Sequence, residues 1–150
     1  MADSIREKIL KNIVTTLQGI TVAAGYNNTV VTVSRQKKDV LEATPTKLPM
    51  LVIFPGSDEP TELFGDLLNR ELFLTILAWI RSATDLEGKL ESFIADVQKV
   101  MAVDYTRATL AIDTQEEETI YLHLEEDDKE GGASIAYTIK YRTKRTDPTQ

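Results

Sequence analysis

Apolar residues recur at helical spacing in two segments of the chain. In the first segment, Ile5, Ile9, Ile13 and Leu17 follow one another at four-residue intervals, until the pattern stops near Gly19. Spacings of three and four place such residues on one face of an α-helix, so both segments are predicted to be amphipathic helices. The second segment covers about residues 85–101, and its apolar stripe consists of Leu86, Leu90, Phe93, Ile94, Val97 and Met101.

Each predicted helix is preceded by residues that can cap its N-terminus. Ser4 with Glu7, and Thr84 with Glu87, have the three-residue spacing of a capping box. In that arrangement the hydroxyl and the carboxylate each accept a hydrogen bond from a backbone N–H that the helix leaves unpaired. The two helices are therefore expected to begin at these positions.

Alternating or continuous apolar residues predict strands in much of the remaining chain. In 119–125 the alternation predicts that Ile120, Leu122 and Leu124 point inward. In the last strand, the residues predicted to share one face are Ala133, Ile135, Tyr137, Ile139 and Tyr141. In 69–81, the residues predicted to share one face are Leu72, Leu74, Ile76, Ala78 and Ile80. The predicted strands cover residues 29–35, 50–54, 69–81, 119–125 and 133–143, and a further short strand is left open at 108–113.

Residues 55–67, PGSDEPTELFGDL, contain two prolines and two glycines. Proline and glycine interrupt regular structure, so this segment is predicted to be a loop. Leu63 and Phe64 are unusually apolar for a loop, where large apolar groups usually cover something. We expect these two side chains to contact either the protein's own core or a neighbouring molecule.

The predicted element order is α-β-β-β-α-(β)-β-β. Strands that follow one another in runs favour antiparallel pairing, with the helices packed on the sheet. We therefore predict an α+β fold, with a mostly antiparallel sheet of four to five strands and two amphipathic helices. A length of 150 residues fits a single domain, 1–150, which ends in a polar basic tail at about 143–150.

Charge is distributed unevenly along a chain whose net charge is −7. Residues 113–130 contain nine acidic residues and one lysine, whereas residues 140–147 contain four basic residues and one aspartate. The acidic excess argues against general nucleic-acid binding, which needs a basic surface. A run of like charges is most often a solvated face, and each segment is first interpreted in that way.

Neither secretion nor membrane insertion is expected. The first ten residues carry charges where a signal peptide needs an apolar run. The longest apolar runs, such as MLVIF, are too short to cross a bilayer.

The sequence contains little that suggests catalysis or metal binding. It has no cysteine, which excludes disulfides, zinc thiolates and thiol nucleophiles. His123, the only histidine, has no evident catalytic partner and is interpreted as a surface or cross-strand residue. The sequence has neither a P-loop nor a GxGxxG motif. No catalytic, cofactor-binding or metal-ligating residue is assigned. The alternative left open is a small metal-dependent hydrolase or binding domain that uses Asp58, Glu59, Glu62 and Asp66.

Four segments follow one another in a characteristic order. A short helix, SIREKIL, opens the chain, and LPMLVIFPGSDEP joins an apolar strand to an acidic loop. ELFLTILAWIRSATDLEGKLESFIADVQKVM joins a long strand directly to an amphipathic helix, and AYTIKYRTKRTDP ends the chain with Tyr-Arg, further basic residues and Asp-Pro. Together these segments resemble the tail-terminator (tail-completion) proteins of long-tailed bacteriophages. The resemblance covers nearly the whole chain, whereas QKKDVLEATPTKLP matches poorly.

The resemblance implies an α+β fold and a structural role without catalysis or a cofactor. Proteins of that family assemble as a ring, typically a hexamer, which caps the finished tail tube, ends its polymerisation and offers a surface to the head. The implied partners are other copies of the chain, the tail tube protein and the head–tail connector. DNA passes through the channel without sequence-specific binding, and no membrane is involved. The implied location is the head-proximal end of the virion tail, after assembly in the host bacterial cytoplasm.

The alternative within the same class is another head–tail connector or a head-completion protein. In either case a ring requires that one surface of each copy meet a different surface of the next. The acidic and basic segments are two unlike surfaces of this kind. The candidate interface residues are Leu63, Phe64, Glu116, Glu117, Glu118, Glu125, Glu126, Asp127, Asp128, Arg142, Lys144 and Arg145.

The C-terminal tail is expected to contribute little to its own domain. No residue after Tyr141 is apolar, and Pro148 lacks the N–H that further strand pairing would need. The basic side chains of the tail are therefore predicted to contact acidic residues of a neighbouring subunit or partner, including the 116–128 segment.

Overall fold

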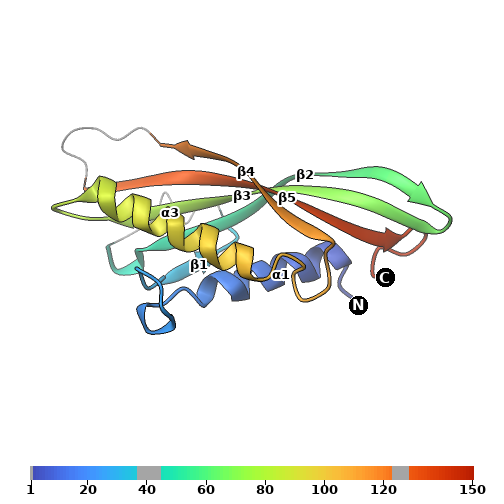
Figure 1. The fold of residues 1–150 in the computed structure, drawn as a ribbon, viewed down its shortest axis with the longest axis horizontal. Coiled ribbons are helices and arrows are strands. Elements are labelled where there is room, and N and C mark those ends of the chain that lie inside the picture. Colours follow the sequence, from blue (N-terminus) through green and yellow to red (C-terminus); the bar gives the residue numbers. More distant parts are fainter. Residues whose placement is uncertain (1, 37–44, 123–128) are drawn as a thin grey trace.

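The computed structural model describes residues 2–36, 45–122 and 129–150. These residues form an α+β fold, as predicted, in which two α-helices lie against a five-stranded sheet (Figure 1). The helices are α1 (Ile5–Gln18) and α3 (Leu86–Val103), and short 3-10 turns occupy Val22–Ala24 and Pro45–Lys47. The strands are β1 (Thr32–Ser34), β2 (Met50–Phe64), β3 (Leu67–Arg81), β4 (Asp113–Tyr121) and β5 (Glu130–Lys144). None of the described helices is both long and apolar enough to cross a bilayer.

The sheet is mixed, with mostly antiparallel pairs. Its strand order is β1-β2-β3-β5-β4. β1 pairs with β2 in parallel, whereas the other three pairs are antiparallel. β3 and β5 pair along their whole lengths, from Leu67 opposite Lys144 to Arg81 opposite Glu130. This central pair joins the two halves of the sheet, because β2 pairs with the other edge of β3 and β4 pairs with the other edge of β5.

Both helices pack on one face of the sheet, and the predicted alternation of β3 and β5 supplies that face. Every second residue of β3 from Leu72 to Ile80 is buried, as are the residues that were predicted to share one face of β5. Ile13 of α1 and Phe93 of α3 are fully buried against them, in one continuous apolar cluster. The opposite face of the sheet is called the outer face below. There a smaller cluster forms, in which the partly buried Trp79 packs against buried residues near the start of β2.

The N-terminal cap of α1 is the predicted residue, whereas the cap of α3 differs from the prediction by one residue. The Ser4 hydroxyl accepts a hydrogen bond from the Glu7 N–H at 3.1 Å, as predicted. At α3 the cap is Asp85 and not the predicted Thr84, and the Asp85 carboxylate accepts from the Gly88 N–H at 3.1 Å. Both residue types can cap a helix, so the choice depends on where the turn after β3 ends.

Residues 55–67 are not the loop that was predicted. β2 continues to Phe64 and β3 begins at Leu67, so the segment forms most of β2 and the turn of a long β-hairpin. The turn contains Gly65 at a φ of 60°. Register shifts follow Pro55 and Pro60, which is where a bulge accommodates a proline. Among the described residues, this part of β2 pairs only with β3, so it is an edge strand. Edge strands tolerate proline because no ladder bond needs the missing N–H.

The strand before β5 also differs from the prediction. β4 spans Asp113–Tyr121, in place of strands at 108–113 and 119–125. A register shift between Glu116 and Thr119 inserts an extra residue, which reverses the alternation beyond it. Ile120 therefore pairs with Ser134 and is 52% exposed, although it was predicted to point inward. His123 and Leu124 lie outside the described residues.

A buried arginine ends α3. Arg107 is fully buried and donates to the backbone oxygens of Met101, at 2.7 Å, and Asp104. Carbonyls at a helix C-terminus lack intrahelical partners, so a cation there satisfies them and suits the helix dipole. Arg107 and the two residues after it have positive φ values, which fixes a tight turn at this point. Burial lowers the pKa of the Arg107 side chain.

Candidate assembly surfaces

The far end of the hairpin projects beyond the helices together with the end of β5 (Figure 1). Residues 57–70 of the hairpin and 140–145 of the C-terminal region are called the arm. At its base, the Asp58 carboxylate accepts from Arg6 Nη1 of α1 at 2.9 Å and from the Tyr141 hydroxyl. Arg70 Nη1 lies 4.0 Å from the same carboxylate and its Nε donates to Thr143. The arm is therefore attached to α1 through a partly buried charged group.

This polar network also affects Tyr141. The pKa of the Tyr141 phenol is raised, mainly because the group is buried and secondly because it bonds to Asp58. A phenolate beside a carboxylate would place two negative charges together, so the neutral hydroxyl is favoured as donor. The base of the arm is thus held by the neutral form of Tyr141.

Apolar and basic candidate residues meet at the end of the arm. Leu63 and Phe64 are 45% and 54% exposed beside the hairpin turn. Leu67 pairs with Phe64 on one side and with Lys144 on the other, so β3 brings the basic end of β5 next to the apolar pair. The set comprising Leu63, Phe64, Arg142, Lys144 and Arg145 is called the arm tip. Sequence reasoning identified all five but did not bring them together, because their proximity depends on the register of β3 with β5.

The backbone of the tail folds back on its own domain, which corrects the prediction that it is free. The Ile5 N–H at the start of α1 donates to the Pro148 carbonyl at 2.9 Å. The Lys144 N–H donates to the Gln150 carbonyl, and the Arg145 N–H donates to Asp66, both at 2.6 Å. The first N–H groups of a helix lack intrahelical partners, so the tail satisfies one of them. The side chains of Lys144 and Arg145 remain exposed.

Deleting residues 146–150 is expected to lower the free energy of unfolding by about 1–3 kcal/mol, because two backbone hydrogen bonds at about 0.5–1.5 kcal/mol each are lost. Chemical denaturation at two salt concentrations measures this. The triple variant Arg142→Gln, Lys144→Gln, Arg145→Gln keeps the backbone bonds and is expected to change stability by about 0.5 kcal/mol or less. An unchanged denaturation midpoint for the deletion would mean that the tail does not stabilise the domain.

The acidic candidates lie on a different part of the molecule. Glu116, Glu117 and Glu118 are exposed on the edge strand β4 and are called the acidic edge. Gln98 of α3 donates to Glu116 at 2.9 Å. Glu116 pairs with Tyr137, seven residues from Lys144, which corresponds to about 23 Å along β5. The acidic edge and the arm tip therefore cannot neutralise each other within one molecule. The other acidic candidates, Glu125, Glu126, Asp127 and Asp128, lie outside the described residues.

A shallow groove of about 520 Å³ crosses the outer face between β2 and β4. Its floor is made largely of small side chains on the central strands, and Glu117 and Glu118 lie at its rim. It is called the sheet groove. The floor and walls include Gly56, Phe73, Thr75, Ile120, Ser134, Ala136 and Thr138.

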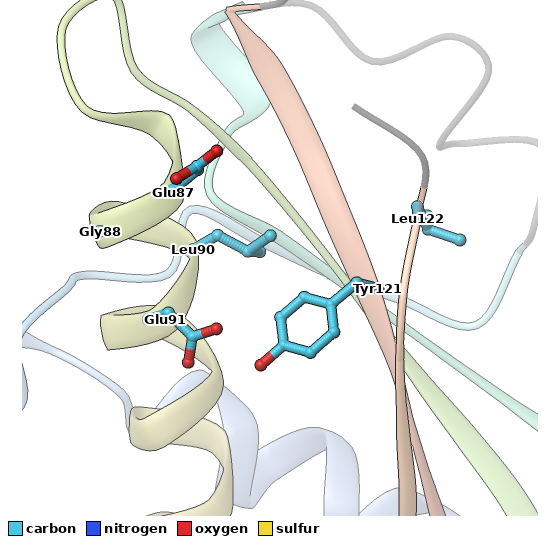
Figure 2. A pocket seen from close by; sticks show the side chains of 6 residues that line it. All are labelled: Glu87, Gly88, Leu90, Glu91, Tyr121 and Leu122. Carbon is cyan, nitrogen blue, oxygen red and sulfur yellow. The ribbon is translucent and has the colours of Figure 1, made fainter. Parts of the chain in front are cut away.

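A second depression, of about 440 Å³, lies between α3 and the end of β4. Figure 2 shows Leu90 and Tyr121 pointing into the space between these elements, with the Glu91 carboxylate close to the Tyr121 hydroxyl. The bond to Glu91 raises the pKa of the Tyr121 phenol. The polar side chains that line this depression are carboxylates and a phenol, which do not form a nucleophile–base pair.

The proposed metal ligands are not brought together. Asp58 faces the helices and is occupied by Arg6 and Tyr141. Glu59 and Glu62 alternate with it on the outer face, and Asp66 lies in the hairpin turn. Within residues 2–36, 45–122 and 129–150, no group of three or more acidic or histidine side chains is placed to hold a metal ion. The structure therefore gives no support to the metal-dependent alternative.

Comparison with known proteins identifies one family over nearly the whole chain. A family described as the bacteriophage tail tube terminator protein matches residues 2–147. Among curated proteins, no match is found. Among solved structures, the chain is similar to a chain in one titled "Virion of native gene transfer agent (GTA) particle". That similarity covers 87% of this chain and 92% of the other, with 9% sequence identity and a TM-score of 0.46.

Proposed function

The chain belongs to the bacteriophage tail tube terminator family, and from this premise we propose that its copies form a ring that caps the tail tube. The protein is a structural, non-enzymatic component of the phage tail. As proposed, the ring is a hexamer that ends tube polymerisation and provides the surface to which the head is joined. The family match over residues 2–147 is the observation that carries this proposal.

The positions of the charged surfaces support assembly of like subunits. The basic arm tip and the acidic edge are unlike, exposed and separated along the sheet. A ring uses heterologous contacts, in which one surface meets a different surface on the next copy. One exposed ion pair contributes only about 0–1 kcal/mol, so several must act together. Ring formation is therefore expected to weaken at high salt, since the Debye length falls to about 3 Å at 1 M.

The proposed partners follow from the position of such a ring. One face contacts the tail tube protein and the other contacts the head–tail connector, at the head-proximal end of the tail. DNA passes through the central channel without sequence-specific binding, and assembly takes place in the host bacterial cytoplasm. A head-completion protein would instead bind the head and leave tube ends uncapped, so the two roles differ in a measurable way.

Purified protein mixed with purified tail tubes is expected to cap one end of each tube in negative-stain images, and the capped end is expected not to elongate when tube subunits are added. Phe64→Ser is expected to reduce the capped fraction at least tenfold, because a 54% exposed side chain is available for contact. Its melting temperature should change little. Val103→Ser, which removes another exposed apolar group, is the matched control. Binding to isolated heads without binding to tube ends would contradict the proposal and favour head completion.

A further inference from the structure

The sheet groove is an apolar hollow on a face without helical cover in the described chain. Phe73 and Thr75 of β3 lie beside Thr138 and Ala136 of β5 across the ladder. Because Thr75 and Ala136 are small, they leave a depression next to the larger Phe73 and Ile120. Ile120 is 52% exposed there, as a result of the bulge in β4. A large apolar group from outside could fill this space and cover Ile120.

The protein's own arm cannot reach this groove. Phe64 pairs with Leu67, and Thr75 in the groove lies eight residues further along β3. Extended strands rise about 3.3 Å per residue, so the two points are about 26 Å apart. β3 is paired with β5 over this entire distance, which prevents the arm from folding back. Any arm tip in the groove must therefore come from another molecule.

The arm tip and the sheet groove are complementary, because one projects and the other is hollow, and because one is basic and the other has an acidic rim. Phe64 and Lys144 flank Leu67 and share its face of the sheet, so the arm tip presents a large exposed apolar side chain beside a basic one, and the exposed Leu63 lies on the opposite face. The groove presents an apolar floor with Glu117 and Glu118 at its rim. We propose that the arm tip of one copy seats in the sheet groove of the next, with Phe64 against Ile120 and the basic residues beside the two glutamates. This contact rests on the proposed ring and specifies the interface that closes it.

The contact is directional. Each copy contributes one arm tip and one groove, and the two surfaces differ, so a copy with its groove filled still presents a free arm tip. Such contacts generate closed rings when the rotation between copies closes, whereas a contact between identical surfaces stops at a dimer. This difference allows a covalent test.

The chain has no cysteine, so an introduced pair reports a single contact. The double variant Phe64→Cys, Ile120→Cys is to be mildly oxidised at high protein concentration. We expect a ladder of disulfide-linked multimers on a non-reducing denaturing gel. A disulfide requires the two Cα atoms to lie within about 7 Å, so the ladder forms only if the arm tip enters the groove. The pair Phe64→Cys, Tyr105→Cys is the matched control, because Tyr105 is similarly exposed and lies outside the groove. Each single cysteine variant should form no multimer larger than a dimer.

Charge reversal provides a second measurement. Glu117→Lys with Glu118→Lys is expected to reduce the yield of ladder about tenfold, and adding Arg142→Glu with Lys144→Glu is expected to restore most of it. Failure of the second pair to restore the ladder would overturn the proposed charge pairing.

The outcomes separate this contact from the proposed function. If wild-type protein forms rings or caps tubes but the Phe64–Ile120 pair gives no ladder, the interface is wrong and the ring stands. A ladder of equal yield from the Tyr105 control, or a product limited to dimers, also overturns the interface. If the wild type neither associates by light scattering nor caps tubes, the proposed ring fails, and the interface fails with it.

Discussion

Leu90→Ala is expected to lower the free energy of unfolding by about 2–5 kcal/mol, the range for removing a buried leucine and leaving a cavity. Leu90 is 2% exposed and belongs to the central apolar cluster, where α3 packs on the sheet. The same interior supports β3 and β5, so the loss should appear in a single cooperative transition. Chemical denaturation followed by the fluorescence of Trp79, the only tryptophan, measures it.

Glu91→Ala is the matched control for this prediction. Glu91 is the next residue of α3 and is exposed. Alanine favours helix, so this substitution is expected to change stability by about 0.5 kcal/mol or less. Equal midpoints for the two variants would show that the wrong face of α3 has been assigned to the core.

The second large effect is expected at Asp96, a buried carboxylate that joins α3 to the turn before β1. Asp96 is 2% exposed and accepts from the backbone N–H of Asn27 at 3.0 Å, from that of Asn28 at 2.9 Å and from Asn28 Nδ2 at 3.0 Å. Asp96→Ala would leave these donors without an acceptor. Since leaving a buried polar group unpaired costs about 1–3 kcal/mol, the total loss is expected to be about 3–5 kcal/mol.

Two further measurements test the role of Asp96. Asn28→Ala removes only the side-chain donor and is expected to cost about 1 kcal/mol. Hydrogen exchange at the Asn27 and Asn28 amides should accelerate in Asp96→Ala at positions that stay protected in Glu91→Ala. If the amides stay equally protected in Asp96→Ala, the carboxylate does not hold this turn.

The arm combines exposure with protection against non-specific pairing. A long edge strand presents unpaired backbone groups that favour aggregation. The exposed part of β2 contains Pro55 and Pro60, each next to a register shift, and acidic side chains between them. Prolines, bulges and charges are the features that keep an edge strand from pairing with another chain. The arm is therefore suited to side-chain contacts at its tip rather than to extension of the sheet.

The sequence was sufficient to predict the two helices, the residues that share a face in β3 and in β5, and the α+β class. Residues such as Ile13, Phe93 and Ile135 report their environment through spacing alone, because helices and strands have fixed periods. Family membership was also predicted from the order of these segments. It could be predicted because the resemblance depended on the same local elements.

The arm, the outward position of Ile120 and the folded tail were decided by tertiary structure. A segment with prolines becomes an edge strand, and not a loop, when another strand lies beside it. Here β3 pairs with the end of β2 and is that neighbouring strand. One extra residue in β4 reversed a face that periodicity had assigned. The Pro148 carbonyl accepts a hydrogen bond from the Ile5 N–H because the first turn of α1 lies beside the tail. Local spacing determines which side chains share a face, but only the register between strands determines which surfaces, such as Phe64 and Lys144, lie together.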